Sequence, residues 1–155
     1  MYTIIKEVTS MTHDYSIYRQ YVCYNCFRQM TECTCKHLPQ NLLFIDEGIQ
    51  EHVRLLNIKG YYTLACCEGH YREDHPDVAM YIALTRDNAD LFPPLPEGFV
   101  FDKKQGITSI RYFYQCARNL PTTEEEFEKE KSTALKSLLE WAEALNDHPY
   151  MVHHE

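Results

Sequence analysis

Hydrophobic residues recur with helical periodicity in two parts of the chain. In the segment 41-NLLFIDEGIQEHVRLLNIKG-60, apolar residues follow one another at spacings of four, four and three, in Ile45, Ile49, Val53 and Leu56. This spacing is typical of the buried face of a helix. Asp46 is placed to cap its start, and Gly60 is placed to end it in the left-handed conformation. We therefore expect a helix over residues 46–59.

A second, longer helix is predicted near the C-terminus. Thr123 and Glu126 have the spacing of a capping box, and three glutamates lie in the first turn, where the helix dipole favours negative charge. One apolar face follows, made of Phe127, Ala134, Leu138, Trp141 and Leu145. A helix over 123–146 would span roughly 35 Å at 1.5 Å per residue, which is enough to cross a sheet.

Apolar runs of strand length predict the remaining elements. They cover residues 2–8, 61–67, 79–84 and 107–116. Alternation along 61–67 places Cys66 and Cys67 on opposite faces of the strand. The segment 92-FPPLPEGFVFD-102 contains three prolines, which fit neither a helix nor a central strand, so an ordered loop is expected there.

These elements predict an α+β fold, with a mixed sheet of four or five strands, two main helices packed on it and an N-terminal zinc-ribbon-like finger. Residues 1–40 would form an N-terminal strand and the zinc-ribbon-like segment, 41–147 the α+β domain and 148–155 a mobile tail. A length of 155 residues fits one compact unit.

Composition narrows the classes of partner. Lys and Arg total 15 against 23 Asp and Glu, and the resulting charge of −8 argues against a nucleic-acid partner. A protein or a small molecule is the expected partner, and the oligomeric state stays open. The sequence has neither a long apolar run nor a signal-peptide pattern, so we expect no membrane association and a cytoplasmic location.

Four closely spaced cysteines are the strongest chemical signal. Cys23, Cys26, Cys33 and Cys35 form a CxxC followed by a CxC. Four thiolates at this spacing can surround one Zn²⁺ tetrahedrally and leave no open position for water, so the expected ion is structural. His37 is an alternative ligand. Without metal, the four residues would be thiols or disulfides.

A second signal lies in 61-YYTLACCEGHYREDHP-76, where Cys, Glu and His follow a predicted strand and a glycine lets the backbone turn. In a working site, Cys67 would be a nucleophile, Glu68 an acid or base, and His70 a general base or a metal ligand.

The alternatives for this turn stay open. Cys67, His70 and His75 could hold a second metal, and Thr63, Gly69 and His75 are candidates for ligand binding. In the simplest interpretation, Cys66 is a small core residue and the histidines belong to a solvated loop.

The segment 46-DEGIQEHVRLLNIKGYYTLACCEGH-70 resembles the core of the tRNA wybutosine-synthesising methyltransferase family. The matching positions are Leu56, Asn57, Tyr62, Thr63, Cys67 and Gly69. The segment departs from the family at Ala65, Cys66, Glu68 and His70, where serines and an arginine are expected. The resemblance implies an RNA modifier that uses S-adenosylmethionine. The chain is also similar to small uncharacterised bacterial and phage zinc-binding proteins.

Two functional hypotheses follow. The first is a zinc-stabilised, non-enzymatic accessory or regulatory protein that binds a protein or a small ligand. The alternative is an enzyme with a site at Cys67, Glu68 and His70, of which a methyltransferase-like RNA modifier is one version. The sequence alone does not decide whether the protein is an enzyme.

Overall fold

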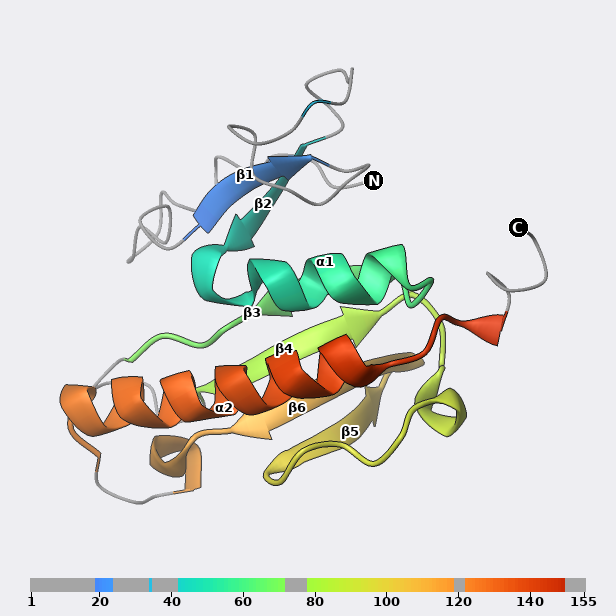
Figure 1. Ribbon diagram of the computed structural model, residues 1–155. Helices are drawn as coiled ribbons and strands as arrows, with labels where there is room; N and C mark the ends of the chain where they lie inside the picture. The colour runs from blue at the N-terminus through green and yellow to red at the C-terminus, as the bar shows by residue number, and fades with distance from the viewer. Residues whose placement is uncertain (1–18, 24–33, 35–41, 72–77, 119–121, 150–155) are drawn as a thin grey trace.

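The computed structural model describes residues 19–23, 34, 42–71, 78–118 and 122–149 (Figure 1). The strands are β1 Arg19–Cys23, β2 Leu42–Asp46, β3 Thr63–Cys67, β4 Ala79–Leu84, β5 Phe99–Lys104 and β6 Ile107–Phe113. The helices are α1 Gln50–Ile58 and α2 Glu124–Ala144, with short 3₁₀ turns η4 Glu47–Ile49, η5 Ala89–Leu91 and η6 Gln115–Arg118. The predicted strand over residues 2–8 lies outside the described residues.

The central sheet has four strands in the order β3-β4-β6-β5, and each neighbouring pair is antiparallel. The α+β class and the two helices are confirmed, but the predicted mixed sheet is wrong. Parallel neighbours need a long crossover, usually a helix, whereas α1 precedes all four strands and α2 follows them. A separate antiparallel pair, β1 and β2, lies on the far side of α1 from the sheet (Figure 1).

Both helix ends follow the sequence signals. Gly60 has φ +92°, and the Tyr61 and Gly60 amides donate to the Leu56 and Asn57 carbonyls, so α1 ends in a Schellman motif. The Thr123 hydroxyl accepts from the Glu126 amide at 3.1 Å and caps α2. Asp46 differs from the prediction, because its side chain makes no capping hydrogen bond.

The segment predicted as a loop over 92–102 ends as a strand. β5 begins at Phe99, pairs with β6 along its length and is the outer strand of the sheet. The turn that joins them consists of Gln105 and Gly106, with φ +53° and +78°, as in a type I′ hairpin. The three prolines precede β5, so they leave its pairing with β6 intact.

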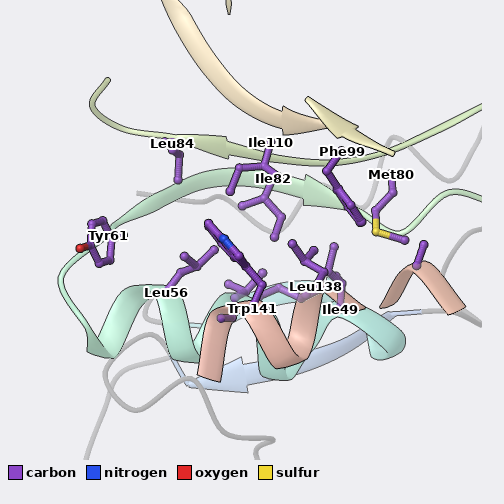
Figure 2. Packing of buried hydrophobic residues seen from close by; sticks show 14 of the residues in the cluster. Ile49, Leu56, Tyr61, Met80, Ile82, Leu84, Phe99, Ile110, Leu138 and Trp141 are labelled. Carbon is purple, nitrogen blue, oxygen red and sulfur yellow. The ribbon is translucent and has the colours of Figure 1, made fainter. Parts of the chain in front are cut away.

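The core lies between the sheet and the two helices. Figure 2 shows side chains of the strands, among them Met80, Ile82 and Ile110, directed toward Leu56, Leu138 and Trp141 of the helices. The whole predicted face of α2 is buried, from Phe127 to Leu145. Among the described residues, neither helix combines the length and apolar character needed to cross a bilayer.

Candidate metal centre

Three potential metal ligands meet at the end of β3. The side chains of Asp46, Cys67 and His70 each offer one donor atom, and these three atoms lie within 4.8 Å of one another. Asp46 is the last residue of β2, Cys67 ends β3, and His70 follows in the turn. Among the described residues, no other group of three or more potential ligand side chains could hold a metal ion.

Asp46 is the centre of this group. It is 1% exposed, and its Oδ2 accepts a hydrogen bond from the Glu68 amide at 3.0 Å. The same oxygen lies 3.2 Å from Nε2 of His70. Its carboxylate therefore faces the turn after β3, which explains why it does not cap the helix as the sequence predicted.

The backbone of the turn is held from two sides. Tyr114, which follows β6, donates its hydroxyl hydrogen to the Glu68 carbonyl at 2.6 Å, and Lys131 of α2 donates to the Gly69 carbonyl at 3.4 Å. Gly69 has φ +86°, and a Cβ there would lie 2.5 Å from the Tyr114 ring. Burial is the main reason why the pKa of Tyr114 is raised, so its hydroxyl stays a donor.

Glu68 does not join the donor group. Its carboxylate is directed against Gly48 and lies 4.0 Å from Nζ of Lys131. Burial raises the pKa of this carboxyl, and the Lys131 ammonium partly offsets that effect. The structure thus brings two of the three predicted catalytic candidates together, Cys67 and His70, and adds Asp46 in place of Glu68.

The two adjacent cysteines have different surroundings. Cys66 lies opposite Ile82 and packs against the hydrophobic core, while Cys67 lies opposite Tyr81. Directly opposed residues of an antiparallel pair share a face, so Cys66 and Cys67 point to opposite sides of the sheet, as the alternation predicted.

The remaining predicted residues fall in different places. Thr63 lies at the other end of β3, where its hydroxyl accepts from Asn57 at 2.9 Å and its amide donates to the same side chain at 3.1 Å. His75 lies outside the described residues, as do Cys26, Cys33, Cys35 and His37, and only the backbone of Cys23 is described. Cys23 pairs with Leu42, so the β1–β2 ladder brings together the two ends of the segment 23–42, which contains all four cysteines.

Asp46 is the residue that sequence reasoning missed. A signal was present, because an aspartate ends the apolar run LLFID and such a position is often buried with its strand. The long sequence separation between Asp46 and the turn conceals their contact. Lys131 and Tyr114 were missed for the same reason. They belong to a predicted helix and a predicted strand, and their contacts with the turn join segments that are distant in the sequence.

The donor set indicates the kind of metal. Carboxylate oxygen, imidazole nitrogen and thiolate sulfur together suit Zn²⁺, whereas Mg²⁺ and Ca²⁺ prefer oxygen ligands alone. Comparisons with protein families, with curated proteins and with solved structures found no match for this chain. The resemblance to the wybutosine-synthesising methyltransferases therefore stays a prediction.

Proposed function

We propose that this protein is a zinc enzyme whose Asp46, Cys67 and His70 hold one zinc ion with a coordination position left open. The observation that carries the proposal is the meeting of three buried or half-buried donor atoms within 4.8 Å of one another. In a tetrahedral zinc site the ligand atoms are roughly 3.5 Å apart, given metal–ligand distances of about 2.0–2.3 Å. Small side-chain rotations would close the difference.

An open position supports hydrolytic chemistry. Catalytic zinc sites have three protein ligands and one water, whereas structural sites have four protein ligands. Zinc lowers the pKa of its bound water to about 7, which supplies hydroxide at neutral pH. Zinc held by Asp46, Cys67 and His70 would supply the chemistry of ester or phosphate-ester hydrolysis, in which water is added across the bond and the leaving group departs with a proton.

The cysteine segment supports a second, structural zinc. We infer that Cys23, Cys26, Cys33 and Cys35 bind it, because the β1–β2 ladder brings the two ends of their segment together. The hypothesis of a non-enzymatic binding protein needs this ion alone. The two hypotheses therefore differ in the number of zinc ions per chain.

Elemental mass spectrometry on untagged, natively purified protein tests the proposal. We expect two zinc ions per chain in the wild type and one in Cys67→Ser or His70→Ala. Cys116→Ser is the matched control, because Cys116 is also half-buried but lies in η6, outside the donor group, and this variant should keep both ions. If His70→Ala retains as much zinc as the wild type, with folding intact by circular dichroism, the proposed centre is wrong.

The enzymatic part has its own readout. Release of 4-nitrophenol from 4-nitrophenyl acetate and from 4-nitrophenyl phosphate should require zinc. Cys67→Ser should lose this activity, and Cys116→Ser should keep it. Equal rates in these two variants would leave a metal site without hydrolytic function.

A further inference from the structure

A row of side chains starts at the proposed metal centre and crosses the sheet. Cys67 lies opposite Tyr81 in the β3–β4 pair, and Tyr81 lies opposite Arg111 in the β4–β6 pair. Opposed residues share a face, and Ile82, which follows Tyr81, points toward the helices (Figure 2). The row therefore lies on the face of the sheet that points away from α1 and α2.

Arg111 is fixed in position on this face. Its guanidinium carbon lies 5.1 Å from the centre of the Tyr81 ring, and its Nε lies 3.1 Å from Oδ2 of Asp102 on β5. Within the described part of the chain, Asp102 is its ion-pair partner, its buried Nε makes no hydrogen bond, and none is made by its terminal amino groups. Those groups keep their hydrogens for another acceptor, and the side chain is 25% exposed.

One of the three proposed ligands lies on the same face of the sheet. Asp46 and His70 are buried at 1% and 9% exposure, whereas Cys67 is half-buried. Cys67 is therefore the most accessible of the three proposed ligands, and it shares its face of the sheet with Tyr81 and Arg111. Neighbouring strands are about 4.8 Å apart, so Arg111 lies two strand spacings, roughly 10 Å, from Cys67.

We propose that the molecule bound at the metal centre is a small anion that lies along this row, with one end on the metal and a carboxylate or phosphate on Arg111. This inference rests on the proposed zinc centre. A guanidinium fork matches carboxylate and phosphate oxygens, and the ring of Tyr81 offers an apolar surface between the two ends. A net charge of −8 and a single cation in the row fit a small molecule better than a nucleic acid.

Isothermal titration calorimetry on zinc-loaded protein tests the inference with three probes of similar length. Adipate has two carboxylates, 5-phosphonopentanoate has a carboxylate and a phosphonate, and hexanoate has one carboxylate. In the wild type, at least one of the two dianions should bind about tenfold more tightly than hexanoate, since a charge-assisted bidentate pair contributes at least that factor. A tighter phosphonate indicates a phosphate-bearing ligand, and a tighter adipate indicates a dicarboxylate.

Arg111→Met should remove the preference for the dianion, because methionine keeps an apolar stem beside Tyr81 and lacks the charge. Lys104→Met is the control. Lys104 lies 3.8 Å from the same carboxylate, Asp102, but is 75% exposed at the end of β5, so this variant should keep the preference.

Two results would overturn the inference while the zinc content stays complete. One is equal binding, or no binding, of all three probes by the wild type, which does not depend on how any variant folds. The other is an unchanged preference in folded Arg111→Met. A turn without zinc, detected by elemental analysis before any probe is added, would instead refute the metal centre, and the inference would fall with it.

Discussion

The shape of the turn after β3 depends on two glycines that have no room for a side chain. A Cβ on Gly69 would meet the Tyr114 ring, and one on Gly48 would meet the Glu68 carboxylate. Both neighbours are buried and are tied to the turn or to α2. The glycines thus let the backbone approach the groups that position Cys67 and His70.

Gly69→Ala should destabilise the protein more than an alanine at another left-handed glycine. We expect it to lower the free energy of unfolding by about 2–4 kcal/mol, from backbone strain and the clash with Tyr114. Gly106 has a similar φ, +78°, with nothing within 4 Å of its Cβ position, so Gly106→Ala should cost only about 1 kcal/mol. Urea unfolding at equilibrium measures both, and equal losses would mean that the contact with Tyr114 relaxes freely.

Sequence reasoning identified part of this site at the level of single residues. Cys67, Gly69 and His70 stood out because they are neighbours in the sequence, at the end of a strand. Asp46 was assigned to a helix cap, because local spacing cannot reveal that its carboxylate bonds to the Glu68 amide. Contacts between distant segments form through tertiary packing, which periodicity does not encode.

At the scale of elements, the sequence was most informative where periodicity and end signals agreed. The strand over 79–84 matches β4. The ends of α1 lie within four residues of their predicted positions, and those of α2 within two. β5 was missed because the prolines in 93–96 were given more weight than the short apolar run FVF that follows them. A Gln-Gly pair between two β-like runs was the signal for that hairpin.

A lysine that directly follows α1 binds the C-terminal end of α2. Nζ of Lys59 donates at 2.8 Å to each of three carbonyls, those of Ala142, Glu143 and Leu145. Helix ends leave such carbonyls without intrahelical partners, so this contact satisfies α2 and joins the two helices.

Lys59→Met should therefore lower the free energy of unfolding by about 1–3 kcal/mol, the range for hydrogen bonds made by a charged group. Lys136→Met is the matched control on the exposed side of α2, and it should change stability by less than about 0.5 kcal/mol. Chemical denaturation followed by circular dichroism at 222 nm compares them. Equal stability of the two variants would show that water replaces the lysine at no cost.

At the scale of the whole molecule, one histidine connects the two helices and makes the stability of the protein depend on pH. His52 of α1 donates from Nε2 to the Leu135 carbonyl of α2 at 2.7 Å, and its Nδ1 is buried without a hydrogen-bond partner among the described residues. Burial lowers the pKa of His52 below its ordinary 6.5, although the Leu135 carbonyl, Glu51 and Glu143 act in the opposite direction.

The unfolded chain therefore binds a proton at His52 more readily than the folded protein. Stability contributed by neutral His52 is present above pH 6.5 and is lost as the pH falls from 6.5 through the lowered pKa of the folded state. His52→Gln keeps a donor for Leu135 but cannot titrate. Its free energy of unfolding, measured by urea titration from pH 7 to pH 5, should fall less steeply than that of the wild type, and parallel profiles would contradict the assignment.

The two-residue turn between β5 and β6 has a consequence for the order of folding. This pairing closes the shortest loop in the sheet, and hairpins of this kind form within microseconds, far ahead of contacts between distant segments. Growth from that edge would add β4 and then β3, which lies at the opposite edge. The proposed ligands Asp46, Cys67 and His70, which come from β2, β3 and the turn after it, would then meet last. Newly made chains would reach the fold before they can bind metal at this centre, and a zinc ion held there would act by slowing unfolding.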